Sequence, residues 1–103
     1  MKLFHVTARR NAEAILAEGL RTDADHGWDA GYIWGFDSLD LATEEAKLSW
    51  GLSRGDNVIF EIDAAGLPVV HDPHQGWGDW RDAHAFAVPQ SIEPERIRLL
   101  EAA

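Results

Sequence analysis

Hydrophobic and polar residues alternate with a period of two at the start of the chain. Phe4 and Val6 fall on one face of an extended backbone. Leu3, His5 and Thr7 fall on the opposite face. The alternation predicts a first strand across these residues, which presents an imidazole and a hydroxyl on the same side.

The apolar spacing then changes to that of a helix. Small or apolar residues recur at i, i+3, i+4, i+7 and i+8, namely Ala12, Ile15, Leu16, Gly19 and Leu20. We therefore expect a helix near residues 8–18. Its first turn would be capped by the Thr7 hydroxyl, and Gly19 would be its left-handed C-cap.

An aromatic segment and a second helix follow. Tyr32, Trp34 and Phe36 would share one side of a strand. Ser38 or Asp40 would then cap a helix that continues to about Trp50. The apolar stripe of this helix would consist of Leu39, Ala42, Ala46 and Trp50.

The second half of the chain contains strand patterns only. Extended segments are predicted at 58–63, 67–71, 85–88 and 96–100, and a long loop at 72–82. Because the strands gather after two early helices, the order favours an α+β fold over a doubly wound parallel sheet.

Composition narrows the class of protein. The chain has 103 residues, no cysteine, and 9 basic against 18 acidic residues, for a net charge of −9. This length suits one domain over 1–103, and the missing cysteines exclude disulfides and thiolate metal sites. No apolar run approaches a membrane span, and no signal segment is evident, so we expect a cytoplasmic protein. The acidity disfavours nucleic acid as a partner, although a confined phosphate pocket stays open.

Two sets of residues have both a chemical and a structural interpretation. His5 and Thr7 can hydrogen-bond a sugar or an amide ligand, or His5 can be a half-buried residue satisfied by backbone. Tyr32, Trp34 and Phe36 can stack on a planar ring, or they can form the core face of a central strand.

A third set has the residue types of a metal site. His71, Asp72 and His74 lie close together in the sequence, with Asp82 and His84 nearby. Their spacing matches no established ligand pattern, so a solvated loop is the preferred interpretation and no metal is expected.

The combination of motifs resembles the ADP-ribosyltransferase-like superfamily. A strand with His-x-Thr, here His5 and Thr7, precedes a helix that ends in an I-L-x-x-G-L phrase at 15–20. Segments 31–46 and 58–67, and the I-x-P-E-x-I phrase before the last strand, fit small bacterial members more loosely. The resemblance implies a split β-sheet core, with two main helices near the N-terminus, that wraps NAD in a cleft.

The resemblance also implies roles for individual residues. His5 would hold a ribose hydroxyl beside Thr7, and Tyr32, or Trp34 if the register slips by two, would pack on the nicotinamide. NAD would be a substrate that loses nicotinamide, and a protein, a small molecule or water would then capture the ribosyl cation. A carboxylate near the ribose would stabilise that charge.

The sequence departs from the family pattern at this carboxylate. The glutamate expected in or just before the strand 85–88 is absent, so His84 or Asp82 would be the polar partner there. The alternative is a non-catalytic module that holds a nucleotide or a protein through the loop with Trp77 and Trp80. The related RNA 2′-phosphotransferases use several arginines, and the charge of −9 opposes an RNA substrate.

Overall fold

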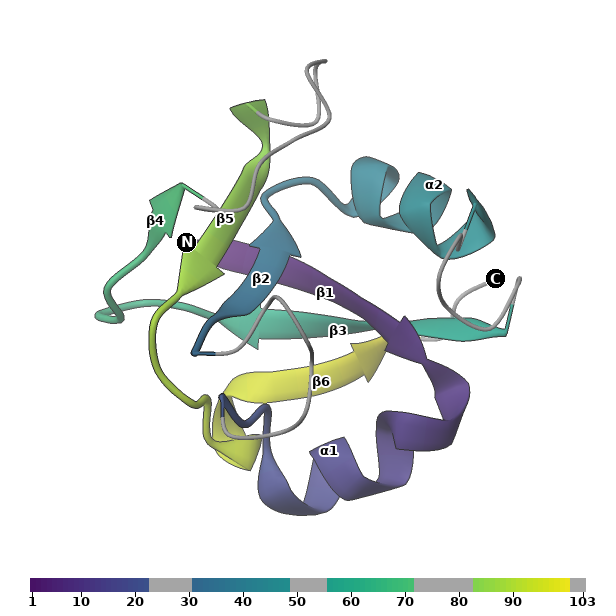
Figure 1. Cartoon of the computed structure of the whole chain (residues 1–103), viewed down its shortest axis with the longest axis horizontal. Helices are drawn as coiled ribbons and strands as arrows, with labels where there is room; N and C mark the ends of the chain where they lie inside the picture. The colour runs from purple at the N-terminus through teal and green to yellow at the C-terminus, as the bar shows by residue number, and fades with distance from the viewer. Residues whose placement is uncertain (23–30, 49–55, 72–82, 101–103) are drawn as a thin grey trace.

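The computed structural model describes residues 1–22, 31–48, 56–71 and 83–100 (Figure 1). Two α-helices, two 3-10 helices and six strands lie in these ranges. In chain order they are β1 (Lys2–Ala8), η1 (Arg9–Asn11), α1 (Ala12–Glu18), β2 (Ile33–Phe36), α2 (Leu39–Leu48), β3 (Asn57–Asp63), β4 (Val70–His71), β5 (Ala85–Val88), η4 (Pro94–Arg96) and β6 (Ile97–Leu100). The α+β class predicted from the sequence is confirmed.

The strands form one antiparallel sheet in the order β4-β5-β2-β1-β3-β6. Strand β1 pairs with β3 along its whole length, from Lys2 opposite Asp63 to Ala8 opposite Asn57. None of the described helices is long and apolar enough to cross a membrane.

Strands β1 and β2 pair over a much shorter length than β1 and β3. These two strands meet at Phe4 opposite Phe36. Beside this position Gly35 lies against β1, where a Cβ atom would stand 3.1 Å from the Phe4 carbonyl oxygen and 3.3 Å from the Leu3 Cβ. The glycine therefore permits the close approach that joins β4-β5-β2 to β1-β3-β6.

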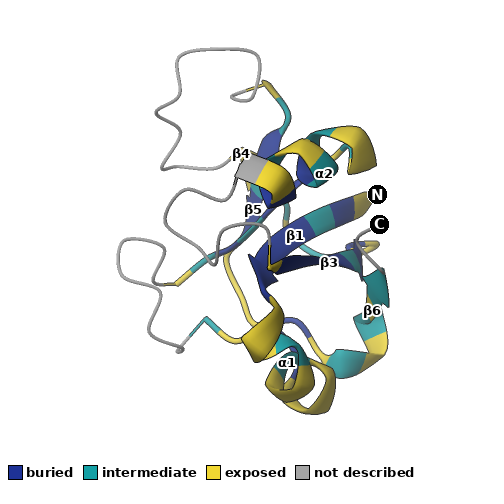
Figure 2. Ribbon diagram, turned by 90° about the vertical axis from the view of Figure 1, so that its right-hand side faces the viewer, coloured by how far each residue is buried: buried dark blue, intermediate teal, exposed yellow. Residues whose placement is uncertain are grey.

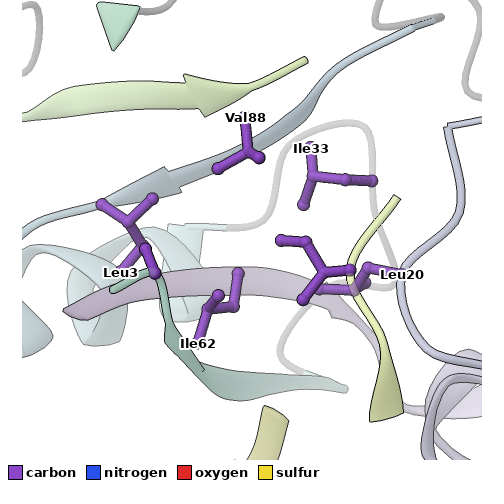
Figure 3. Packing of buried hydrophobic residues seen from close by; sticks show 7 residues of the cluster. Leu3, Leu20, Ile33, Ile62 and Val88 are labelled. Carbon is purple, nitrogen blue, oxygen red and sulfur yellow. The ribbon is translucent and has the colours of Figure 1, made fainter. Parts of the chain in front are cut away.

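The two helices cover opposite faces of the sheet (Figure 1). Leu3 belongs to a cluster against which Ile15 of α1 packs, whereas Val6 belongs to a cluster that includes residues of α2. The buried members of the first cluster are Leu3, Leu20, Ile33, Ile62, Ala64, Val88 and Ile92 (Figure 3). Those of the second are Val6, Phe36, Ala42, Ala46, Ile59 and Ala85.

The start of the first helix differs from the prediction. The expectation that Thr7 caps the helix was wrong, because strand pairing continues through Thr7 opposite Val58 and Ala8 opposite Asn57. Helical structure begins with the 3-10 turn η1, and Ala8 is its N-cap residue. The strand thereby holds Thr7 on the sheet, and no side chain caps the first helical turn.

The end of the first helix is partly as predicted. Gly19 has a positive φ of 82°, but its ψ of −172° is extended and not left-handed helical. The chain consequently turns at once into a bridge in which Leu20 and Ile92 exchange backbone hydrogen bonds of 2.9 and 2.7 Å. Leu16, which the apolar stripe placed toward the core, is 47% exposed.

The second helix begins where the sequence predicted it. The Leu41 amide donates to the Ser38 hydroxyl at 3.4 Å, and Ala42 and Ala46 are buried. Leu39, predicted on the same stripe, is exposed because it precedes the turns that contact the sheet. Trp50 lies outside the described residues.

Candidate functional site

A pocket of about 360 Å³ lies where α1 meets β1. Strand β1, the turn η1, the helix α1 and the three residues after it contribute its walls. The lining residues are His5, Thr7, Arg10, Asn11, Ala14, Ile15, Glu18, Gly19, Leu20 and Arg21. This volume is in the range of pockets that bind small molecules.

His5 forms part of the floor of the pocket and is 6% exposed. Its Nδ1 lies 2.7 Å from the Trp34 carbonyl oxygen, and the two rings lie 5.1 Å apart at 58°. Because a carbonyl accepts, Nδ1 must carry a proton in this contact. In the neutral imidazole the lone pair then resides on Nε2, so β2 fixes both the orientation and the tautomer of the ring.

Thr7 lies beside His5 on the same face of β1 and is 8% exposed. Its hydroxyl oxygen accepts from the Asn11 Nδ2 at 3.1 Å. The contact links the strand to the first helical turn and places an amide and a hydroxyl at one end of the pocket. The sequence prediction that His5 and Thr7 face the same way is confirmed.

The charged residues of the pocket were not all expected. Arg10 and Arg21 supply two guanidinium groups and Glu18 supplies one carboxylate. The signal was present in the sequence: Asn11, Ala14, Ile15 and Glu18 follow the i, i+3, i+4, i+7 spacing of one helical face. The apolar stripe through Leu16 predicts a face whose centre lies about one residue further along the helix than the face that lines the pocket.

Strand β2 directs Trp34 and Phe36 into the hydrophobic cluster on the α2 side of the sheet. Trp34 packs against the second cluster, and its ring meets that of Phe36 edge to face at 5.7 Å. Tyr32 is half-buried just ahead of β2. Neither Tyr32 nor Trp34 lines the described pocket. The Trp34 carbonyl oxygen does contact His5, which is a lining residue. Their proposed contacts with nicotinamide stay a prediction.

His84 lies elsewhere, at the start of β5. Its Nδ1 is 2.9 Å from the Asp37 Oδ1, and the Asp37 amide donates to the His84 carbonyl oxygen at 3.1 Å. Neither residue is in the lining of the described pocket. Asp82, Trp77 and Trp80 lie outside the described residues.

Of the residues weighed as metal ligands, His71 and His84 lie in the described ranges. His71 stacks on Phe86, with ring centres 4.8 Å apart at 25°. Asp72 and His74 lie outside the described residues. Within the described ranges no three histidine or carboxylate side chains are grouped as a metal site would need.

Comparison with known proteins adds no assignment to this geometry. No family model matches the chain, and no curated protein matches it. The function is therefore argued from the pocket itself.

Proposed function

We propose that the pocket between β1 and α1 binds NAD as a substrate, on an ADP-ribosyltransferase-like fold. The observation that carries the proposal is that His5 and Thr7, two buried polar side chains, line one pocket together with Arg10 and Arg21. A small number of polar side chains in the lining of a pocket fix the orientation of a ligand and its specificity. The short pairing of β1 with β2 also supports the proposal. In a split core the two halves of the sheet diverge, so their central strands pair over a short length.

The charge of the pocket suits a phosphate-bearing ligand. The whole chain carries −9, yet the lining contributes two arginines against one glutamate. Guanidinium groups donate to phosphate oxygens in a fixed planar geometry, so two arginines in one pocket suit the two phosphates of a dinucleotide. The pocket is thus a cationic site on an acidic protein, and free anions are repelled from the remaining surface.

The reaction would replace the bond between the ribose carbon and nicotinamide with a bond from that carbon to a nucleophile. The carbon–nitrogen bond breaks, its electron pair leaves with nicotinamide, and the positive charge passes to the sugar. A nucleophile on a protein, on a small molecule or in water then bonds to that carbon and releases its proton. His5 would orient the ribose, since it lines the pocket and the Trp34 carbonyl oxygen holds its ring in place.

The proposal is tested with the full chain and NAD labelled in the nicotinamide ring. Bound NAD and released nicotinamide are measured for the wild type and for the His5→Ala, Arg10→Gln and Arg98→Gln variants. We expect His5→Ala to abolish release and Arg10→Gln to weaken binding at least tenfold. Arg98→Gln, a matched arginine on β6 that contacts Glu61, leaves both unchanged.

The alternative is a module that binds the nucleotide without turnover. It is favoured by one observation: His84 contacts Asp37 and does not line the described pocket with His5. Binding of NAD with no release of nicotinamide would support this module. If the wild type neither binds NAD nor releases nicotinamide, both functions are wrong.

A further inference from the structure

Asn11 occupies a helix-capping position without capping the helix. It is the N-cap residue of α1, where asparagine is favoured because its side-chain oxygen can accept from a free backbone amide. Its side chain forms no capping hydrogen bond to the described first turn. It lines the pocket, and among the described residues it makes one hydrogen bond, from Nδ2 to the Thr7 hydroxyl at 3.1 Å. The side chain of Asn11 is therefore directed to the pocket and not to the end of the helix.

The contact with Thr7 leaves part of the amide group for a ligand. An asparagine amide has two N–H donors and one carbonyl acceptor, and the Thr7 hydroxyl takes one of the donors. Oδ1 and the other N–H then present an acceptor and a donor from the same planar group. Thr7 is held in strand β1 and is 8% exposed, so it is a fixed support for this amide.

Apolar side chains continue the pocket wall beside the amide. Ala14 and Ile15 follow Asn11 by three and four residues, so they lie on the same side of the helix, and both line the pocket. A planar base can pack on such a wall while its polar edge meets the amide. Asparagine recognises adenine by a bidentate contact of this kind in nucleic acids.

We infer that Asn11 recognises the base of the bound dinucleotide and makes the pocket prefer adenine over hypoxanthine. The inference rests on the proposed function. Adenine has a donor at N6 and an acceptor at N1, which match Oδ1 and the N–H of Asn11. Hypoxanthine has an acceptor at O6 and a donor at N1, which oppose these groups because the ribose keeps the base in the same direction. A bidentate contact corresponds to a preference of about tenfold.

The test compares two dinucleotides that differ only in the purine. Dissociation constants for NAD and for nicotinamide hypoxanthine dinucleotide are measured by calorimetry with the wild type, Asn11→Ala, Asn11→Asp and Glu13→Gln. We expect the wild type to prefer NAD about tenfold and Asn11→Ala to have no preference. Asn11→Asp should reverse the preference, because a carboxylate accepts from the N1–H of hypoxanthine and repels the lone pair at N1 of adenine. Glu13 does not line the described pocket, so Glu13→Gln should keep the wild-type ratio.

Each result decides the inference. If the wild type binds both dinucleotides equally, the inference is wrong while the proposed function stands. If Asn11→Ala or Asn11→Asp keeps the wild-type preference, another residue recognises the base and the inference is equally wrong. A loss of the preference in Glu13→Gln would assign it to the charge of the helix and would also contradict the inference. If the wild type binds neither dinucleotide, the proposed function fails and the inference with it. Circular dichroism of each variant verifies that the fold is retained.

Discussion

The two helices cover the sheet in different ways. On one face, α2 places Ala42 and Ala46 against the strands, and both are buried. On the other face, α1 has no buried residue (Figure 2). A pocket of about 360 Å³ lies where this helix meets β1. One helix completes a solid core, and the other forms the wall of a pocket.

The difference follows from where each helix is anchored. Small alanine side chains let the backbone of α2 come close to the sheet, and Ala42 and Ala46 are buried there. Helix α1 is held at its two ends. Before it, the Arg9 amide donates to the Asp56 carbonyl oxygen at 3.0 Å, and after it Leu20 bridges to Ile92. A segment fixed at its ends and loosely packed in the middle can keep a cavity open without losing its position.

The strongest way to break this arrangement is to remove the anchor at the end of α1. A Cβ at Gly19 would collide with the Ile92 carbonyl oxygen, which accepts from Leu20 in the bridge. The positive φ of 82° adds strain for any other residue. We expect Gly19→Ala to lower the free energy of unfolding by about 2–4 kcal/mol, as measured by urea denaturation.

Gly66→Ala is the matched control for this change. Gly66 has a similar φ of 78°, but a Cβ there meets nothing within 4 Å. Only the conformational cost should remain, about 1 kcal/mol. Equal losses for the two variants would show that the contact with Ile92 does not anchor the helix.

A smaller change in stability should distinguish the packing of α2 on one face of the sheet from that of α1 on the other. Ala42 is fully buried against the sheet, so Ala42→Leu must displace its neighbours and should cost about 1–3 kcal/mol in urea denaturation. Ala14 is exposed and lines the pocket, so Ala14→Leu should change stability by less than about 0.5 kcal/mol. The same Ala14→Leu variant should weaken NAD binding at least tenfold, because the added side chain occupies the pocket. If Ala14→Leu lost more stability than Ala42→Leu, the helix packed closely against the sheet would be α1 and not α2.

Strand β1 and the start of the second helix were predictable because their signals are local. The extended segment predicted at 67–71 was partly wrong, because only Val70 and His71 pair as a strand. Alternation along β1 placed His5 and Thr7 on one face, and the sequence at Ser38 marked the start of α2. The end of β1 was misjudged at Thr7. Whether a threonine caps a helix or continues a strand depends on the partner strand, here Val58, which lies far away in the sequence.

The composition of the site was less predictable for the same reason. His5 was a candidate because of its motif, but its contact with the Trp34 carbonyl depends on how β1 and β2 meet. Glu18 lies on the pocket face of α1, whereas Arg21 follows the sharp turn of the chain at Gly19. The pairing of His84 with Asp37 depends on the register of β5 with β2, which sets Ala85 opposite Phe36. Long-range register is not encoded in any short segment.

The smallest predicted effect concerns an ion-pair group on the sheet, away from the pocket. Glu61 of β3 lies between Lys2 of β1 and Arg98 of β6, at 3.2 and 3.1 Å. The hydrogen bond from Lys2, followed by that from Arg98, lowers the pKa of Glu61 against the opposing effect of burial. Because the folded pKa lies below the ordinary value of 4.5, the ionised group stabilises the fold above that pH. This contribution is lost as pH falls through the folded pKa.

We therefore expect Glu61→Gln to cost about 0.5–1 kcal/mol at pH 7 in urea denaturation, and the wild type and the variant to converge as the pH falls from 7 through the folded pKa of Glu61. Glu95→Gln changes an exposed glutamate in η4, and its stability should stay parallel to that of the wild type across this range.

NAD binding at pH 7 should be the same in all three proteins, because neither glutamate lines the described pocket. A gap between Glu61→Gln and the wild type that is constant with pH would show that the side chain acts by packing and not by charge. A loss of NAD binding in Glu61→Gln would mean that the pocket depends on the ion pairs joining β1, β3 and β6, and that the loosely packed face is not independent of the rest of the sheet.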